Sequence, residues 1–245
     1  MTRRVCLLTG ASGHFGSAFI ERYAGHYQIV AVHHRGEIRF ATQEQRFFDP
    51  LDPPLAVSRN EHAVHAIRAD LTTDGGIEET VREVVEVCGG VDLVIHAAAV
   101  RAFGSILQPR TTEEYRHVFD VNLIAPLRLS VALANALWHH DPEENARRRR
   151  NIVNVSSTAG LFVYEDLGQA LYGTSKAALN HLTYHLASEL WTLGVRVNAI
   201  APDTFPGRVT TEEVLDAVIA LDESEETGQV IPLYRQPPAR QEVAQ

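Results

Sequence analysis

The chain has 245 residues, 45% of them hydrophobic, and a formal net charge of -9 at pH 7. This length and composition allow one large α/β domain with a full hydrophobic core. The acidic balance argues against a nucleic-acid partner, because a phosphate backbone requires a basic face. We expect a single domain over residues 1–235, followed by a flexible tail at 236–245.

Three local features favour a cytoplasmic protein without a bound metal. Cys6 and Cys88 show no metal-ligand spacing and are interpreted as reduced thiols. The apolar run at residues 5–8 is too short for a secretion signal, and no later segment is expected to span a membrane. The four arginines at 147–150 follow several acidic residues, so we interpret them as a solvated turn rather than a nucleic-acid patch.

A short apolar strand at residues 5–8 leads into a glycine-rich turn and then into a helix-like pattern. A dinucleotide site needs this order, because its glycines make a tight turn, admit the pyrophosphate and allow close helix packing. The helix N-terminus then faces the phosphates. Glycines alone would also fit a plain turn. The candidate cofactor-binding residues in this turn are Gly10, Ser12, Gly13, His14, Phe15 and Gly16.

The second predicted strand, residues 29–32, ends without the acidic residue that usually holds the ribose of NAD. Arg35 follows instead and could face a 2′-phosphate, which favours NADP(H). Glu37 lies close enough to keep NAD(H) possible. Arg35 could also be a solvated loop cation.

Residues 36–60 fit no regular period, and Phe47 and Phe48 would pin this segment to the sheet. A third strand around 63–69 closes with Asp70 and Leu71. Asp70 could accept a hydrogen bond from an adenine amino group or cap the helix predicted at 77–87. A fourth strand at 91–99 ends in small residues, Ala97 and Ala98 among them, which leave room for a ligand or permit close packing.

The second half of the chain alternates long helices with buried strands. A helix predicted at 111–138 carries Asn122 within an apolar run, so this side chain should have a specific backbone or water partner. The strand at 151–155 runs into Ser156 and Ser157 at the edge where parallel sheets bind ligands. A further strand at 195–200, a helix at 211–222 and a last strand starting near 227 complete the pattern.

Tyr172 and Lys176 lie four residues apart on a predicted helix, and Lys176 is the only lysine in the chain. Positions i and i+4 share a helix face, so the phenol and the ammonium would lie side by side. A nearby cation favours the phenolate and lowers the pKa of the tyrosine. Such a tyrosine can exchange a proton with an alcohol or carbonyl oxygen. An isolated pair of this spacing is more often an ordinary surface pair.

Taken in this order, the motifs resemble the short-chain dehydrogenase/reductase family over about residues 4–202, with a weaker continuation to 233. The resemblance implies a three-layer, Rossmann-type, doubly wound parallel sheet. It also implies that Tyr172 is the acid/base, that Lys176 lowers its pKa and holds the nicotinamide ribose, and that Ser157 binds the substrate oxygen. Asn122 would hold a water that links Lys176 to solvent. The implied cofactor contacts beyond the glycine turn are Arg35, Asp70, Leu71, Ala97, Ala98, Tyr172, Lys176 and Pro202.

The sequence departs from the family pattern at several points. His14 replaces the usual second glycine, and the spacing of Gly10, Gly13 and Gly16 looks like the sugar-nucleotide branch. About 43 residues follow Pro202, too few for that branch's substrate domain. The helix expected between the second and third strands is missing. Asp203 replaces a glycine, and the shortened loop at 204–208 would suit a bulky or carrier-bound substrate.

The leading hypothesis is an NADP(H)-dependent ketone or aldehyde reductase, or a secondary-alcohol dehydrogenase, acting on a small-molecule carbonyl or alcohol. One alternative is a relative of sugar-nucleotide epimerases and dehydratases. Another is a nucleotide-binding regulator or scaffold without turnover. The resemblance also implies a homodimer or homotetramer, paired through the helices at 111–138 and 172–191.

Overall fold

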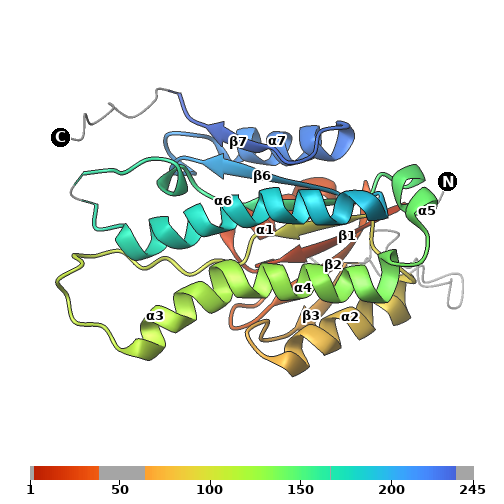
Figure 1. Cartoon of the computed structure of the whole chain (residues 1–245), viewed down its shortest axis with the longest axis horizontal. Helices are drawn as coiled ribbons and strands as arrows, with labels where there is room; N and C mark the ends of the chain where they lie inside the picture. The colour runs from red at the N-terminus through yellow and green to blue at the C-terminus, as the bar shows by residue number, and fades with distance from the viewer. Residues whose placement is uncertain (1–2, 39–63, 166, 236–245) are drawn as a thin grey trace, which may run out of the picture.

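The computed structural model describes residues 3–38, 64–165 and 167–235. Its centre is a seven-stranded parallel sheet with the strand order β3-β2-β1-β4-β5-β6-β7 (Figure 1). The order reverses direction between β1 and β4, the point at which open α/β sheets bind ligands. The strands are β1 Arg4–Thr9, β2 Tyr27–His33, β3 His65–Arg68, β4 Leu93–His96, β5 Asn151–Val155, β6 Arg196–Pro202 and β7 Val230–Leu233.

Helices cover both faces of the sheet, which confirms the predicted three-layer, doubly wound fold. The α-helices are α1 His14–Tyr23, α2 Asp74–Cys88, α3 Thr112–Phe119, α4 Ala125–Leu133, α5 Pro142–Arg147, α6 Ala170–Leu190 and α7 Thr211–Glu223. Two π-helical segments, η1 Asp120–Ile124 and η2 Ala134–Trp138, and two 3₁₀ turns, η3 Thr158–Gly160 and η4 Trp191–Leu193, complete the set. In Figure 1, α2, α4 and α6 lie together in front of the sheet.

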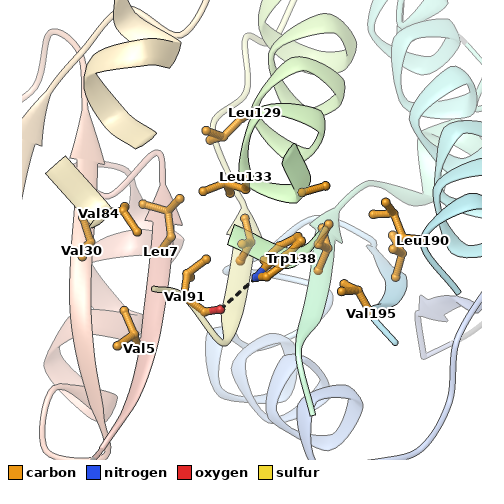
Figure 2. Packing of buried hydrophobic residues seen from close by; sticks show 14 of the residues in the cluster. Val5, Leu7, Val30, Val84, Val91, Leu129, Leu133, Trp138, Leu190 and Val195 are labelled. Atoms are coloured by element: carbon orange, nitrogen blue, oxygen red, sulfur yellow. Dashed lines mark hydrogen bonds between the residues drawn. The ribbon is translucent and has the colours of Figure 1, made fainter. Parts of the chain in front are cut away.

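The two faces of the sheet build two separate cores, because successive strand residues point to opposite sides. In β1, Val5 and Leu7 join the core beneath α2, α4 and α6, whereas Cys6 and Leu8 join the core beneath α1 and α7. Trp138 is fully buried in the first core, and its indole N–H donates to the carbonyl of Val91 at 3.3 Å (Figure 2).

The helical stretch predicted at 111–138 is confirmed as α3, η1, α4 and η2 in succession, with the two π segments as an unpredicted feature. Thr112–Trp138 is also long and apolar enough to cross a membrane by length and composition, contrary to the sequence expectation. It packs on the sheet through Leu129, Leu133 and Trp138. Core helices meet the same criteria, so this one gives no support for a membrane location.

Two predictions lie outside the described residues. One is that the stretch around Phe47 and Phe48 is irregular and lacks the helix usual for the family, and the other is the flexible tail at 236–245. The structure also decides which residue caps the N-terminus of α2. The hydroxyl of Thr73 accepts from the amide of Gly76 at 3.1 Å, so Thr73, not Asp70, is the N-cap.

The interpretation of residues 147–150 as a solvated turn is wrong for three of the four arginines. Arg148 makes two hydrogen bonds, of 2.6 and 2.8 Å, to the carboxylate of buried Asp92. Arg149 donates to the carbonyls of residues 223 and 224, and Arg150 to the side chain of Asn145. Arg147 is the most exposed of the four, with 77% of its side chain accessible, whereas the side chain of Arg149 is 42% exposed. The run holds the amino-terminal edge of the sheet together.

Candidate active site

Two cavities of about 320 Å³ each open along the carboxyl-terminal edge of the sheet. The loop after β4 lies between them, because its residues 97–100 line one cavity and Arg101 and Phe103 line the other. The glycine-loop cavity is lined by Gly10, Ser12, Gly13, Arg35, Asp70, Leu71, Ala97, Ala98 and their neighbours. The tyrosine cavity is lined by Arg101, Phe103, Ser157, Tyr164, Gln169, Tyr172, Pro202, Asp203, Phe205, Arg208 and their neighbours.

The glycine turn has the close contacts that a nucleotide-binding loop requires. Gly10 has a positive φ of 69°, and a Cβ there would lie 2.7 Å from the amide nitrogen of Ala98. A Cβ on Gly16 would lie 2.6 Å from the Cα of Ala11. Gly13 caps α1 without a side chain, so the helix N-terminus stays accessible from the cavity. Backbone N–H groups at a helix N-terminus bind phosphates well.

His14 and Phe15 turn their side chains away from this cavity. His14 hydrogen-bonds the hydroxyl of Thr211 at 2.7 Å, and Phe15 is buried against Phe19 and Phe205. Any cofactor contact of these two predicted residues would therefore come from the main chain. The replacement of glycine by His14 leaves the glycine-loop cavity open, because the imidazole packs toward α7 instead.

Arg35 and Asp70, two of the predicted cofactor contacts, both line the glycine-loop cavity. Asp70 accepts from the hydroxyl of Thr72 at 2.7 Å and from its amide at 3.0 Å. These bonds, with that of the hydroxyl foremost, lower the pKa of Asp70 below its ordinary value. A fixed carboxylate at this position can accept a hydrogen bond from a ligand.

Lys176 is 2% exposed and lies on α6, four residues after Tyr172. Its ammonium donates to the carbonyl of Val155, the last residue of β5, at 2.9 Å. Burial lowers the pKa of Lys176 to about 8. The side chain therefore carries its charge at neutral pH in a site with little water.

Tyr172 lies beside this lysine, with the ammonium 6.0 Å from the centre of its ring. Burial raises the pKa of Tyr172, and a hydrogen bond from Ser157 and the charge of Arg101 offset only part of that rise. The expected lowering of this pKa by Lys176 is thus not found. The free energy lost by removing the phenolate from water exceeds the stabilisation that Ser157 and Arg101 give it.

The two serines after β5 have different surroundings. Ser156 is 4% exposed, and its hydroxyl donates to the carbonyl of Lys176 at 3.3 Å. Ser157 lies in the tyrosine cavity close enough to Tyr172 to act on its pKa, and its Oγ accepts from the amide of Ala159 at 3.2 Å. Of the two serines, Ser157 is thus the one next to Tyr172, and its contact with the substrate oxygen stays a prediction.

Asn122 is fully buried in the π segment η1 and has the specific backbone partner that the sequence predicted. Its Oδ1 accepts from the amide of Val100 at 2.7 Å, and its Nδ2 donates to the carbonyl of Val100 and to the hydroxyl of Ser175, both at 2.9 Å. The side chain ties the loop after β4 to α6, which carries Tyr172 and Lys176. Both hydrogens of the side-chain amide are donated to protein atoms, so the predicted water would have to bind to another atom of Asn122.

The sequence analysis missed several residues of the tyrosine cavity because they lie on loops that carry no motif. Phe103 packs its ring edge-on to that of Tyr172, with 5.4 Å between ring centres. Gln169 has a buried amide oxygen without a hydrogen-bond partner among the described residues. Pro202, predicted as a cofactor contact, lines the tyrosine cavity rather than the glycine-loop cavity.

Comparison with known proteins gives a consistent result. The family model for short chain dehydrogenases matches residues 4–216. Galactitol 2-dehydrogenase of Agrobacterium fabrum is 31% identical over 233 residues, which cover 94% of this chain and 80% of that protein. An oxidoreductase structure from Brucella ovis, in complex with a partially ordered NAD, is 28% identical with a TM-score of 0.69 and covers 95% of this chain and 100% of its own. The Pseudomonas aeruginosa RhlG/NADP complex has the same fold, with a TM-score of 0.74, 22% identity and 94% of both chains covered.

The chain belongs to the short-chain dehydrogenase/reductase family. It is an NAD(P)-dependent oxidoreductase that acts on alcohol or carbonyl groups, as the sequence predicted.

Proposed function

We propose that this enzyme is an NADP(H)-dependent carbonyl reductase or secondary-alcohol dehydrogenase whose reaction takes place in the tyrosine cavity. The observation that carries the proposal is the meeting of Ser157, Tyr172 and buried Lys176 beside the glycine-loop cavity. The narrow space around Gly10, which a Cβ on that residue would fill, fits the phosphates of a dinucleotide. The bound nicotinamide supplies or accepts the hydride, and the chain supplies position, charge and a proton.

In reduction, Tyr172 would donate its phenolic proton to the substrate oxygen while the carbonyl carbon gains a hydride, so that a ketone becomes a secondary alcohol. The raised pKa of Tyr172 keeps the phenol protonated at neutral pH, ready for this step. Ser157 would donate a hydrogen bond to the same oxygen. Charged Lys176, whose ammonium lies 6.0 Å from the centre of the Tyr172 ring, would hold the nicotinamide ribose beside the phenol. The oxidation of an alcohol would follow the reverse path.

The preference for NADP(H) over NAD(H) is proposed on the position of Arg35, two residues after the end of β2, where it lines the glycine-loop cavity. The neighbouring structures bind one cofactor or the other, so they do not decide the matter. The test is the affinity of NADPH and NADH for the wild type, for Arg35→Ala and for a surface control, Arg82→Ala. We expect NADPH to bind more tightly, and only Arg35→Ala to remove the difference. Equal affinities in the wild type would contradict the preference.

The reaction itself is tested with a panel of ketones, aldehydes and secondary alcohols, monitored by loss or gain of NADPH absorbance. A larger hollow of about 820 Å³ adjoins the tyrosine cavity and shares Tyr164, Leu167 and Gln169 with it. Its presence supports a bulky substrate, so the panel includes large carbonyl compounds. Tight cofactor binding without turnover of any member would favour the non-catalytic alternative.

A homodimer or homotetramer paired through the α3–η2 stretch and α6 is likewise proposed. Large apolar side chains on these helices remain exposed, among them Tyr115, Val131 and Tyr184, as does Trp191 directly after α6. Burial of such a face on a second copy would stabilise an oligomer. Light scattering after size exclusion should give a dimer or larger, and a monomer at micromolar concentration would contradict it. A cytoplasmic location also stays a prediction.

A further inference from the structure

We propose that the substrate carries a carboxylate, and that Arg101 binds this carboxylate while the reacting carbonyl or alcohol group meets Ser157 and Tyr172. The inference rests on the proposed function above and names its substrate class: an oxo acid in reduction or a hydroxy acid in oxidation. The reaction stays the same, since one hydride and one proton convert the ketone to the alcohol and the carboxylate is unchanged.

Arg101 lies on the wall of the tyrosine cavity, on the loop that follows β4. It is close enough to Tyr172 for its positive charge to favour the phenolate. A carboxylate held by Arg101 would therefore place the reacting group of the substrate beside the phenol. Arginine suits this task, because its planar fork matches a carboxylate in bidentate geometry.

Arg101 has no hydrogen bond or ion pair with any other described residue. This contrasts with arginines elsewhere in the described structure, such as Arg4 with Asp222 and Arg148 with Asp92. Acidic residues outnumber basic ones in this chain, which has a net charge of -9. Even so, no described carboxylate pairs with Arg101, and its guanidinium group is therefore available to a ligand.

The other charges of the cavity cancel. Arg208 lies 3.4 Å from the carboxylate of Asp203, whose side chain is only 10% exposed. Among the charged residues that line the tyrosine cavity, Arg101 is thus the one without a described counter-charge, and the ammonium of Lys176 behind Tyr172 adds to the positive charge. The rest of the wall mixes polar side chains, such as Gln169 and Thr204, with apolar ones, such as Phe103 and Phe205. The apolar side chains can contact the carbon skeleton of a substrate whose carboxylate Arg101 holds.

The competing assignment is that Arg101 contacts the cofactor, since residues 97–100 of the same loop line the glycine-loop cavity. The two roles separate kinetically. A substrate contact changes the KM and kcat/KM for the acid and leaves the affinity for NADPH unchanged, whereas a cofactor contact weakens NADPH binding for every substrate.

The experiment compares 2-oxo, 3-oxo and 4-oxo acids with their methyl esters, which keep the carbon skeleton and remove the charge. Wild type, Arg101→Gln, Arg101→Lys and the surface control Arg82→Gln are measured with NADPH. We expect at least one acid to be preferred over its ester by about tenfold or more. Arg101→Gln should lower kcat/KM for that acid by about ten- to a hundredfold and change that for the ester by less than about threefold. Arg101→Lys should restore part of the loss, and Arg82→Gln should behave as wild type.

Equal use of acid and ester by the wild type, or an equal loss of both in Arg101→Gln, would overturn the inference and leave the proposed reductase activity standing. If no compound is turned over, the proposed function fails, and calorimetric titration of the oxo acids into the NADP⁺-loaded protein decides the inference alone. Binding to wild type that Arg101→Gln abolishes supports it. Binding that is absent, or the same in both proteins, overturns it.

Discussion

At the scale of single residues, the burial of Lys176 determines how the site responds to pH. Its ammonium has one described protein partner, the carbonyl of Val155. Desolvation alone lowers the pKa of Lys176 from 10.5 to about 8. The lysine can therefore change its charge near the pH at which a dehydrogenase operates.

This pKa can be measured directly, because Lys176 is the only lysine in the sequence. Protein labelled with ¹³Cε-lysine should give a single lysine signal in NMR, with a titration midpoint at about 8 in the cofactor-free enzyme. A midpoint near that of free lysine, about 10.4, would contradict the burial argument.

The same shift has a consequence for stability. The unfolded chain binds more protons than the folded chain between pH 8 and 10.5, so this group raises the free energy of unfolding as pH increases through that window. The gain approaches about 1.4 kcal/mol per pH unit in the middle of the window. Urea denaturation at pH 7.5 to 9.5 should show this slope in wild type and a flatter one in Lys176→Met.

Tyr172 is the second test at this scale. Tyr172→Phe removes only the hydroxyl and keeps the ring contact with Phe103. Loss of the proton donor should lower kcat by about 10² to 10⁴-fold while NADPH affinity changes by less than about twofold. Tyr184→Phe, on the exposed side of the same helix, is the matched control. An unchanged kcat in Tyr172→Phe would exclude this residue as the acid.

At the scale of elements, the site depends on close packing of α6 against the turn η3, which directly follows Ser157. Two glycines permit this approach. A Cβ on Gly173 would lie 2.7 Å from the carbonyl oxygen of Ala159, and one on Gly160 would lie 2.6 Å from the carbonyl carbon of Lys176. Ser157 and Tyr172 reach one another because both backbones lack a side chain at these points.

Gly173→Ala tests this packing. Alanine favours the helix by about 1 kcal/mol in isolation, but here it would push α6 away from η3. We expect kcat/KM to fall by about tenfold, because small displacements of reacting groups are costly. Gly75→Ala on α2, where a Cβ would meet nothing within 4 Å, is the control and should leave activity unchanged. Full activity in Gly173→Ala would show that the contact can relax.

The strands, the glycine turn and the pair of Tyr172 and Lys176 could be predicted from the sequence because each has a local pattern, an apolar run or a fixed spacing. The π segment that holds Asn122 could not, since it follows from how the helix packs rather than from any residue type. The raised pKa of Tyr172 was missed for a related reason: the i,i+4 spacing indicates a neighbour but not the burial of both groups. Arg101 and Gln169 lie on loops, where only the tertiary structure decides which side chains meet.

At the scale of the whole molecule, a network of buried charges fastens the amino-terminal edge of the sheet. Buried Asp92 accepts from the amide of Val5 at 2.9 Å and from Arg148. Fully buried Asp222 accepts from Arg4 at 2.6 Å and from the hydroxyl of Tyr27 at 2.9 Å. These bonds connect β1, β2, the start of β4 and the end of α7, far from the cavities at the opposite edge.

Arg148→Ala should therefore destabilise the fold and leave the catalytic activity of the folded enzyme unchanged. It leaves the carboxylate of Asp92 buried without its cation, which costs about 3 to 5 kcal/mol of unfolding free energy. Arg147→Ala, one residue earlier but largely exposed, should cost less than about 1 kcal/mol. Urea denaturation of both variants checks the contrast. Equal losses would mean that Asp92 finds another partner.

The position of the only lysine also determines how reagents meet this enzyme. Because Lys176 is buried, the folded surface offers no ε-amino group. Amine-directed cross-linkers, acylating labels and aldehyde supports would therefore meet no lysine side chain on the folded enzyme. Acylation of Lys176 would report that the fold had opened.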